Sequence, residues 1–437
     1  MKLTGIRSIE DLAYPLRNDG GALGRAELSP HTPAGPKPDK PSETSALNGK
    51  RLLIRVDYNV PLDKKTGAIT DDSRIRESLP TIEYAIAAGA KVILASHMGR
   101  PKPGKREGLS LEVCGARLAE LLKVEVLLPE DCVGDAPSKV IHDLRAGQIC
   151  LLENLRFHEE EERDDEGFAR QLAELCDVYV NDAFGAAHRA HASVHALPRM
   201  MRDRGAGFLM LKELRSLSRL IDRPEKPYVA VLGGAKVSDK IDVVEALLQV
   251  VDTLCIGGAM ANTFLAAQGK NMQKSRIEED KLPLARTILD KAAAKRVDVA
   301  LPQDVIVADS LDAAAGEAAS VDGVPAGTMA LDIGPKTIEA FGRKIATAKT
   351  VFWNGPMGLF ETAAFSKGTF EIARIMSGVS GFTVVGGGDS AAAVKKAGEG
   401  IAKGFNHIST GGGASLELIE GKKLPGVEAL RSGEAAE

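Results

Sequence analysis

From residue 51 onward, short runs rich in β-branched residues and leucine alternate with longer stretches rich in alanine, leucine, glutamate and lysine. The runs are apolar throughout, a pattern typical of parallel strands that are covered on both faces. They lie at 51–56, 91–95, 124–128, 149–152 and 178–180, and then at 228–232, 253–256, 305–308, 350–353, 382–385 and 407–409. This alternation predicts an α/β protein with two doubly wound parallel sheets, that is, two Rossmann-like domains.

An amphipathic segment separates the two halves. Residues 208–221 place apolar side chains at i, i+4, i+7 and i+11, namely Met210, Leu214, Leu217 and Ile221. This spacing puts one apolar stripe on a helix, and prolines at 224 and 227 end it. We therefore expect one domain at 1–205, a connecting hinge helix within 206–223 and a second domain at 224–415.

The segment from 14 to 46 differs in composition from the rest of the chain. It holds six of the 21 prolines, at 15, 30, 33, 36, 38 and 41, interleaved with glycine, asparagine, serine and threonine. Such a composition favours an extended arm over a core element. The rest of the 437-residue chain suits two domains without a third.

Charge and cysteine usage exclude several classes of protein. The chain has 56 basic and 60 acidic residues, a formal charge of −4, which argues against nucleic-acid binding because that function needs a basic surface. The five cysteines form no C-x-x-C pair, so neither a disulfide framework nor a zinc site is indicated. No apolar leader and no run of ~18 apolar residues occurs, so we expect a cytoplasmic protein without a membrane partner.

Glycine-rich turns follow five strands of the second half. They lie in GGAKVSDK (233–240), GGAM (257–260), NGPMGLFE (354–361), GGGDS (386–390) and STGGGAS (409–415). Ligands of open α/β sheets bind beyond the carboxyl ends of the strands, and glycine lets backbone N–H groups approach a phosphate closely. One such turn could serve local geometry alone. Five turns, together with Lys236, Lys240, Glu361 and Asp389, indicate a nucleotide site.

Neither of two common nucleotide motifs explains these turns. Residues 386–391 fit G-x-G-x-x-A, but the acidic residue that a dinucleotide site needs ~20 positions later is missing. No G-x-x-x-x-G-K-[ST] motif occurs. An NAD-dependent dehydrogenase is therefore the weaker alternative, and we expect the nucleotide to be held in another way.

Cations take the place of glycines at the strand ends and turns of the first half. They are Arg55, Arg74, His97, Arg100, Arg156 and Arg189. Any one of them could be an ordinary surface residue, but together with Asp57 and Asn59 they indicate a pocket for a small polyanion. Guanidinium groups bind phosphate or carboxylate with two parallel hydrogen bonds. Arg55 has the alternative role of orienting Asp57.

Two further clusters are interpreted as structural. His188, His191 and His195 have the i, i+3, i+7 spacing of zinc ligands on one helix face, but no well-spaced fourth ligand follows. The acidic run at 159–166 is typical of a solvated surface or a helix start. We expect no metal at either place.

Eight motifs, in chain order, resemble those of the phosphoglycerate kinase family. They are RVDYNVP, SHMGRP, LLENLRF, AHRAHAS, LGGAKVSDKI, VFWNGPMGLFE, VVGGGDS and ISTGGGASLELIEGKKLPGVEAL, and the match runs from about Leu47 to Leu430. The resemblance implies a transferase of glycolysis and gluconeogenesis. Its reaction would be reversible, Mg²⁺-dependent phosphoryl transfer between ATP and the carboxylate of 3-phosphoglycerate, giving 1,3-bisphosphoglycerate and ADP. We expect a monomer.

The resemblance assigns the two substrates to different domains. The N-terminal domain would bind 3-phosphoglycerate through Asp57, Asn59, Arg74, His97, Arg100, Arg156 and Arg189. The C-terminal domain would bind ADP or ATP through Gly233, Gly234, Ala235, Lys240, Gly258, Leu331, Asn354, Pro356, Glu361, Gly387, Gly388, Asp389 and Ser390. Asp389 is similar to the family's Mg²⁺ ligand and Glu361 to its ribose contact. Residues 416–437 resemble a segment that returns to the N-terminal domain.

The same resemblance implies which groups contact the transferred phosphoryl group. They are Arg74 and Lys236, aided by the N–H groups of Gly411, Gly412 and Gly413. A carboxylate is already ionised at neutral pH, so the reaction needs no general base and depends on positioning and charge. We expect the substrates to meet when the domains close about the hinge helix, which would also exclude water.

The chain departs from the family pattern in three places. The arm at 14–46 resembles an insertion, Thr328 and Ala330 replace bulkier or glycine residues near the nucleoside pocket, and Tyr58 replaces a more usual phenylalanine. None of them is a catalytic group. A non-catalytic nucleotide sensor with the same fold is the rival from another class, and the presence of Arg74 and Lys236 argues against it.

Overall fold

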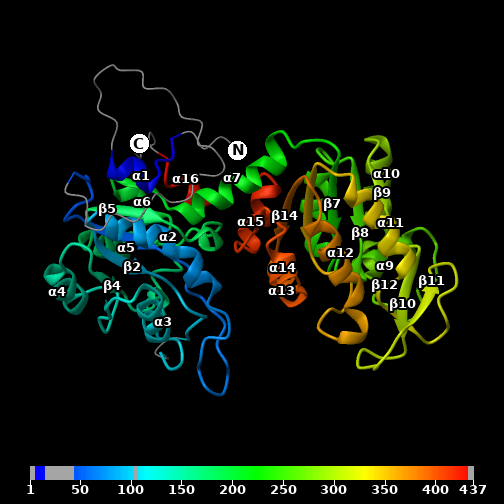
Figure 1. The fold of residues 1–437 in the computed structure, drawn as a ribbon, viewed down its shortest axis with the longest axis horizontal. Coiled ribbons are helices and arrows are strands. Elements are labelled where there is room, and N and C mark those ends of the chain that lie inside the picture. The colour runs from blue at the N-terminus through cyan, green and yellow to red at the C-terminus, as the bar shows by residue number, and fades with distance from the viewer. Residues whose placement is uncertain (1–4, 15–43, 103–105, 432–437) are drawn as a thin grey trace. The chain divides into compact units, whose positions relative to one another are not determined.

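The computed structural model describes residues 5–14, 44–102 and 106–431, which divide into two compact units (Figure 1). The first unit comprises the described residues up to 214 together with 423–431, and the second unit comprises 215–422. Apart from Tyr14 and 44–46, the proline-rich arm lies outside the described residues. Across the described part of the chain, no helix has the length and apolar character needed to cross a membrane.

The first unit is built on a six-stranded parallel sheet in the order β3-β4-β2-β1-β5-β6. The strands are β1 (Arg51–Arg55), β2 (Lys91–Ala95), β3 (Val126–Leu127), β4 (Ile149–Leu151), β5 (Val178–Asn181) and β6 (Arg204–Ala206). In β1 and β2 the last four residues are all buried, so both faces of the sheet are covered. The apolar runs therefore correctly predicted parallel strands, although β6 was missed because its residues, Arg-Gly-Ala, are not apolar.

Short helices surround this sheet. They are α1 (Ile9–Ala13), α2 (Ser73–Ala87), α3 (Glu112–Leu122), α4 (Asp135–Asp143), α5 (Glu166–Glu174), α6 (Ala196–Met200) and α16 (Pro425–Glu428), with 3-10 turns η1 (Leu155–Phe157) and η2 (Phe184–Ala186). Two of these helices begin with side-chain caps. Ser8 and Asp11 form a reciprocal capping box on α1, and Asp165 accepts a hydrogen bond from the N–H of Phe168 at the start of α5.

The second unit has its own six-stranded parallel sheet, in the order β15-β14-β13-β7-β8-β9. Its strands are β7 (Tyr228–Leu232), β8 (Thr253–Ile256), β9 (Asp298–Ala300), β13 (Thr350–Asn354), β14 (Phe382–Gly386) and β15 (His407–Ile408). All residues of β7 and β13 are buried, and the two strands pair in parallel at the centre of the sheet. Two parallel sheets, one in each unit, confirm the predicted fold class.

One predicted strand of the second half belongs to a different sheet. β10 (Asp304–Ala308) pairs antiparallel with β11 (Glu317–Ser320) and β12 (Met329–Ile333) in a separate three-stranded sheet. Placing 305–308 in the parallel sheet was therefore wrong. The less apolar β9 occupies that place beside β8. A short apolar run shows that a strand is buried but not which sheet it joins, because pairing depends on distant residues.

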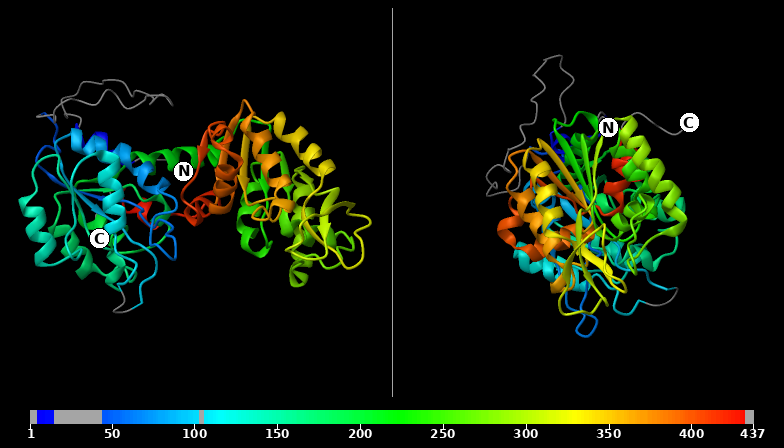
Figure 2. Two further views of the ribbon diagram at one scale, coloured as in Figure 1. Left: turned by 60° about the horizontal axis from the view of Figure 1, so that its bottom comes forward. Right: turned by 90° about the vertical axis from the view of Figure 1, so that its right-hand side faces the viewer.

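The remaining helices belong mainly to the second unit. They are α8 (Ile241–Leu247), α9 (Gly258–Ala267), α10 (Leu282–Ala294), α11 (Pro335–Ala346), α12 (Lys367–Ser377), α13 (Gly388–Ala397), α14 (Glu399–Ala402) and α15 (Gly413–Ile419), with 3-10 turns η3 (Ser238–Lys240), η4 (Glu279–Lys281) and η5 (Ala363–Phe365). Figure 2 shows the helices of each unit arranged around its sheet.

Helix α7 (Phe208–Asp222) contains the division between the units and matches the helix predicted at 208–221. Its start is held by the first unit, where the Phe208 N–H donates to Thr81 Oγ1 at 2.9 Å and the Met210 N–H to Asp182 Oδ1 at 3.0 Å. The end of the described chain also lies in the first unit. Arg431 forms a β-bridge with Ile6, and its carbonyl accepts a hydrogen bond from Arg204 at 2.6 Å.

Candidate functional site

The predicted cations of the first unit lie at the carboxyl edge of four neighbouring strands. Arg55 ends β1, His97 and Arg100 follow β2, Arg156 lies in η1 after β4, and Arg189 follows β5 and η2. Because β4, β2, β1 and β5 are adjacent in the sheet, their carboxyl ends share one edge. The sheet order therefore collects side chains that are up to about 130 positions apart in the chain, as 55 and 189 are.

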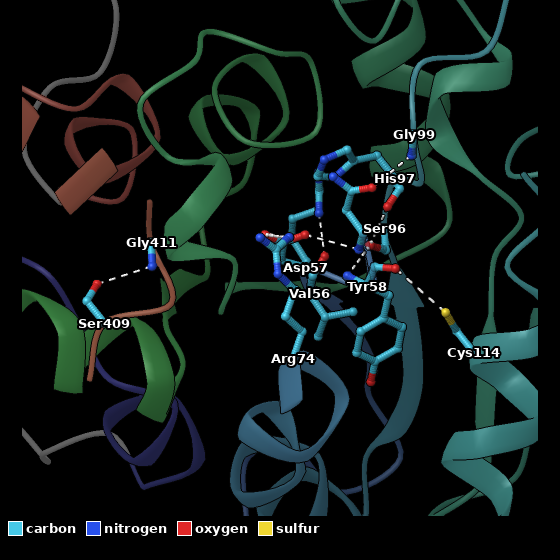
Figure 3. A network of polar contacts seen from close by, with 12 residues as sticks. Val56, Asp57, Tyr58, Arg74, Ser96, His97, Gly99, Cys114, Ser409 and Gly411 are labelled. Carbon is cyan, nitrogen blue, oxygen red and sulfur yellow. Dashed lines mark hydrogen bonds and ion pairs between the residues drawn. The ribbon is translucent and has the colours of Figure 1, made fainter. Parts of the chain in front are cut away.

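Asp57 and Arg74 form an ion pair within this cluster (Figure 3). An Arg74 guanidinium nitrogen lies 2.8 Å from Asp57 Oδ2, and the two side chains are 34% and 13% exposed. Burial alone would raise the pKa of Asp57, but the positive charges of Arg74 and Arg55, together with a hydrogen bond from the Asn59 N–H, hold it below its usual value. Asp57 is thus ionised and positions the partly exposed guanidinium of Arg74.

His97 is a buried neutral imidazole with a defined tautomer. Burial, reinforced by Arg55, Arg156 and Arg74, holds its pKa well below the usual value against the opposing charge of Asp57. Its Nδ1 lies 3.0 Å from the guanidinium of Arg55. Because arginine can only donate, Nδ1 must accept, and the ring proton is therefore on Nε2. His97 thus keeps one N–H donor on its other nitrogen.

Arg55 supports the cluster from within the core, and it is only 1% exposed. Its guanidinium donates to Ser193 Oγ at 2.8 Å, to the Val56 carbonyl and to His97. These contacts favour the alternative role, in which Arg55 supports its neighbours, over direct contact with a ligand. Arg55 acts on Asp57 only through its nearby charge.

The partner that makes this burial tolerable is Glu161, a fully buried carboxylate. It accepts hydrogen bonds from the Ser193 N–H at 2.8 Å and the Ser193 hydroxyl at 2.5 Å, so Ser193 bridges it to Arg55. Interpreting the whole acidic run 159–166 as surface was wrong at this position, although its other acidic side chains are at least partly exposed. Nothing in the local sequence separates Glu161 from Glu160 or Glu162.

The loop after β2 connects Asn59 to Arg156. Asn59 Oδ1 accepts the Gly99 N–H at 2.9 Å, and the Gly99 carbonyl accepts a hydrogen bond from Arg156 at 2.7 Å. Arg156 Nε also lies 3.0 Å from a Glu162 carboxylate oxygen, and the Arg156 side chain is nearly buried. Arg100, next in this loop, is exposed. The loop therefore aligns an amide, a buried guanidinium and an exposed guanidinium along one edge.

The segment after β5 adds further basic groups. Arg189 Nε donates to His188 Nε2 at 3.1 Å. Burial, together with Arg156, Arg55, Arg189 and His188, lowers the pKa of His191 to about 4. Residues 188–195 are not helical, so the i, i+3, i+7 spacing does not place the three histidines on one helix face. His191 belongs instead to the environment of the cation cluster, a contribution that the sequence reasoning missed.

The second unit contains a cavity of about 470 Å³ at the glycine-rich strand ends. Seven of the predicted nucleotide-binding residues line it: Gly234, Ala235, Gly258, Leu331, Pro356, Glu361 and Asp389. The lining also includes Asn262, Lys274 and Arg276, which the sequence reasoning missed because no strand end or glycine turn marks them. Two cations beside a largely apolar cavity suit a ligand with an apolar ring and an anionic end.

Glycines are required where this cavity meets the backbone. A Cβ atom on Gly233 would lie 2.1 Å from the carbonyl oxygen of Pro356, and one on Gly258 would lie 2.5 Å from the nitrogen of Gly234. Gly258 also has φ +67°, which disfavours any other residue. The turns after β7, β8 and β13 are therefore packed directly against one another, and the predicted set forms one structure.

The other predicted nucleotide-binding residues support this wall. Lys240 Nζ donates to Asn354 Oδ1, and Asn354 Nδ2 donates to the Gly386 carbonyl at 2.8 Å. Ser390 Oγ accepts the Gly355 N–H at 2.6 Å. Gly387, with φ +90°, and Gly388 form the start of α13, where Asp389 is exposed in the first turn. Burial lowers the pKa of Lys240 to about 8, although Asp389 opposes this effect.

The remaining predicted catalytic groups lie on two loops of the second unit. Lys236 is exposed on the turn after β7. Gly411, Gly412 and Gly413 follow β15 and lead into α15. The N–H of Gly411 donates to Ser409 Oγ at 3.1 Å, drawn in Figure 3, while Gly413 is exposed.

Comparisons with known proteins show which family this chain resembles over most of its length. The family model described as "Phosphoglycerate kinase" matches residues 43–422. A "Phosphoglycerate kinase" of Anaeromyxobacter sp. (strain Fw109-5) is 56% identical over 387 residues, which cover 88% of this chain and 97% of the relative. One from Moorella thermoacetica is 54% identical, covering 88% and 97%. The solved "Structure of phosphoglycerate kinase from Coxiella burnetii" has a TM-score of 0.79 at 41% identity, covering 88% and 96%.

Proposed function

Because the chain belongs to the phosphoglycerate kinase family, we propose that its first unit binds 3-phosphoglycerate and its second unit binds ADP or ATP. Membership of the family establishes the reaction class, in which a phosphoryl group passes between a nucleotide and the carboxylate of the acid. It makes the chain a phosphotransferase of glycolysis. The assignment of each substrate to named residues is our inference from the two sites.

The cation cluster of the first unit carries this proposal. Arg74, Arg156 and Arg189 occupy one sheet edge together with the Nε2–H of His97, and their combined charge suits a small acid with a phosphate and a carboxylate. Arg100 extends the set from the adjoining loop. Asp57 and Asn59 hold Arg74 and the Gly99 loop in place, so their contribution would be orientation as well as contact.

The cavity of the second unit supports the nucleotide assignment. Its apolar lining, which includes Leu331, Pro356 and Met357, suits an adenine ring, and Glu361 can accept hydrogen bonds from ribose hydroxyls. Lys240 lies behind the glycine turns at the wall of this site, where its ammonium group would meet phosphate oxygens. Gly387 and Gly388 would allow phosphates to approach the start of α13.

The residues present fit a magnesium ion. Asp389 is an exposed carboxylate on the cavity wall, and Mg²⁺ is usually held by one or two carboxylates, substrate phosphates and water. Asp389 would hold it, and the bound ion would supply charge neutralisation for the phosphates. Among the residues that the structure describes around this cavity, the metal donors are carboxylate oxygens of Asp332, Glu361 and Asp389, of the kind that Mg²⁺ prefers.

The residues of this chain would act by charge and orientation. The attacking carboxylate is already ionised at neutral pH, so the site needs no general base. Lys236 and Arg74 would stabilise charge on the transferred group, as would the N–H groups of Gly412 and Gly413. The N–H of Gly411 would join them by exchanging its hydrogen bond to Ser409 for one to phosphate. Since the substrates are assigned to different units, transfer requires the units to approach, and we propose α7 as the hinge.

An arginine substitution tests the assignment of substrates to units. In a coupled assay of ATP-dependent 3-phosphoglycerate phosphorylation, we expect Arg156→Ala to raise KM for the acid at least about tenfold, as loss of a charge-assisted contact would. ADP affinity, titrated separately, should stay within about twofold. Arg170→Ala, which removes an exposed arginine of α5, is the matched control. Unchanged KM for the acid, or an equal loss of ADP affinity, would contradict the assignment.

We further propose a cytoplasmic monomer. The five cysteines, at 114, 132, 150, 176 and 255, are all buried free thiols, which suits a reducing compartment. Size-exclusion chromatography with light scattering tests the monomer directly, since a dimer would have twice the 46.2 kDa mass of one chain.

A further inference from the structure

A second group of ligand-type side chains lies in the first unit, separate from the contacts described above. It consists of Asp131, Cys132 and His158, whose carboxylate oxygen, sulfur and ring nitrogen all lie within 4.8 Å of one another. Within the part of the chain that the structure describes, it is the one such group of three or more. The sequence had indicated no zinc site, because the cysteine spacing forms no metal motif.

Sheet topology brings these residues together. Asp131 and Cys132 lie on the loop between β3 and α4, and His158 ends the η1 turn that follows β4. Strands β3 and β4 are parallel neighbours, with Val126 opposite Ile149, so the loops that leave them emerge at the same edge. Cys132 and His158 are therefore close in space, although they lie 26 positions apart in the sequence.

The group is held in position before any ion binds. Asp131 Oδ1 accepts the Cys132 N–H at 2.7 Å and the His158 Nε2–H at 2.6 Å. The His158 ring stacks on Phe168 of α5, with ring centres 5.3 Å apart and planes 26° from parallel. The side chain of Cys132 is fully buried, while Asp131 and His158 are each about a quarter exposed. An ion could therefore enter from the side of Asp131 and His158.

Distance and chemistry both favour a divalent ion of intermediate softness. Zinc bonds of about 2.0 Å to nitrogen and 2.3 Å to sulfur place tetrahedral ligands roughly 3.5 Å apart, so small side-chain rotations would suffice. A mixed set of carboxylate, thiolate and imidazole suits Zn²⁺, whereas Mg²⁺ prefers oxygen ligands alone. Zinc would replace the proton of the Cys132 thiol, which would pass to solvent, while His158 would bind as a neutral imidazole whose proton moves from Nε2 to Nδ1 by exchange with water.

One neighbouring cation competes for the same carboxylate. An Arg106 guanidinium nitrogen lies 3.0 Å from Asp131 Oδ2, and this side chain is 52% exposed. The guanidinium also lies over the ring of Phe157, 4.9 Å from its centre. Arg106 can leave Asp131 without creating a buried unpaired charge, because it is exposed to water. It would therefore weaken metal binding without preventing it.

We propose that Asp131, Cys132 and His158 form a binding site for Zn²⁺ or a similar divalent transition ion, with water completing the coordination. The site is distinct in ligand chemistry from the magnesium site proposed at Asp389. It adds a metal-linked contact between the β3 and β4 loops, and β4 leads directly into the turn that carries Arg156.

Cobalt(II) alone, added to the full-length protein without nucleotide, tests the proposal. Co²⁺ accepts the same ligands as zinc, and cobalt–thiolate bonding gives a charge-transfer absorption band that oxygen sites lack. We expect a saturable band at one equivalent, removed by added Zn²⁺ but not by excess Mg²⁺. Cys132→Ser should abolish the band, and Cys176→Ser, which removes another buried thiol, should leave it unchanged. A wild-type protein without the band, or a band that survives in Cys132→Ser, would overturn the proposal.

Two partly exposed positions give an independent test if Cys132→Ser proves unfolded by circular dichroism. His158→Gln should weaken cobalt binding at least about tenfold. Loss of a residue that only hydrogen-bonds to a metal ligand already lowers metal affinity by about that factor. Arg106→Gln should strengthen binding by removing the competing cation. Unchanged cobalt affinity in folded His158→Gln would refute the site, and so would weaker binding in Arg106→Gln.

Discussion

Replacing Arg55 by methionine tests whether the stability of the first unit depends on a buried charge behind the cation cluster. Methionine keeps the apolar stem of the side chain, so most of the core stays filled. The guanidinium hydrogen bonds to Ser193 Oγ, the Val56 carbonyl and His97 Nδ1 are lost. Glu161 then remains fully buried without the cation beside it.

The expected cost follows from that unpaired carboxylate. Arg55 and Glu161 are buried charges of opposite sign bridged by Ser193, and removing one partner of a buried ion pair typically costs about 3–5 kcal/mol because the remaining charge cannot be solvated. Arg163 provides the matched control on the same segment as Glu161. It pairs with Glu159, both side chains are more than half exposed, and its substitution by methionine should cost less than about 1 kcal/mol.

Urea unfolding can assign this loss to the first unit. The single tryptophan, Trp353, is buried in β13, so its fluorescence reports the second unit. Circular dichroism follows helices of both units. A transition seen by circular dichroism but not by fluorescence therefore reports the first unit. We expect Arg55→Met to move that transition to a lower urea concentration and to leave the fluorescence transition in place.

A double-mutant cycle separates charge from packing. Glu161→Gln keeps oxygen and nitrogen atoms near Ser193 while removing the charge, so it should recover much of the stability lost in Arg55→Met. We expect a coupling free energy of at least about 2 kcal/mol. An Arg55→Met variant no less stable than Arg163→Met, or a double variant whose losses simply add, would refute the reasoning.

Three further predictions concern the second unit. Burial sets the pKa of Lys240 at about 8, so its ammonium group loses its proton as the pH rises through that value. ADP affinity, measured by calorimetry, should therefore fall between about pH 7 and 9. The Lys240→Arg variant should show a flatter dependence of ADP affinity on pH. Lys236→Ala should lower kcat at least ~10²-fold in the coupled assay, and near-wild-type turnover would reject its catalytic role. Gly258 has φ +67°, and a Cβ there would lie 2.5 Å from the Gly234 nitrogen. Gly258→Ala should therefore destabilise the second unit by about 1–3 kcal/mol and weaken ADP binding. Gly323→Ala, where a Cβ meets nothing within 4 Å, should change neither property.

The sequence alone predicts much of the fold because its signals are local. Non-alternating apolar runs report burial on both faces, and ten of the strands they predicted lie in the two parallel sheets within a residue or two at either end. Where the run was weak, as in β6 and β9, or where the partner strand differed, as in β10, the prediction failed. Strand partners are decided by packing among distant segments, which no local pattern records.

The candidate site shows the same division. The sequence shows which kinds of residue follow the strands, glycines in one half and cations in the other. Because the carboxyl ends of parallel strands share one edge of a sheet, these residues could be assigned to one site in each half. Their separate roles are not visible. Arg55 ends the first predicted strand and Arg74 lies in the segment that follows it, yet one is buried against Ser193 and the other is partly exposed beside Asp57.

The amino-acid sequence thus determined the class of fold, the family and the two kinds of chemistry at the strand ends, because periodicity and motif spacing act over short stretches of chain. Only the tertiary structure decided which charges are buried and which groups meet. Glu161 reaches Ser193 across 32 positions, and His158 reaches Asp131 across 27. Such contacts depend on sheet order and on the exclusion of water, and both arise only when the whole unit packs.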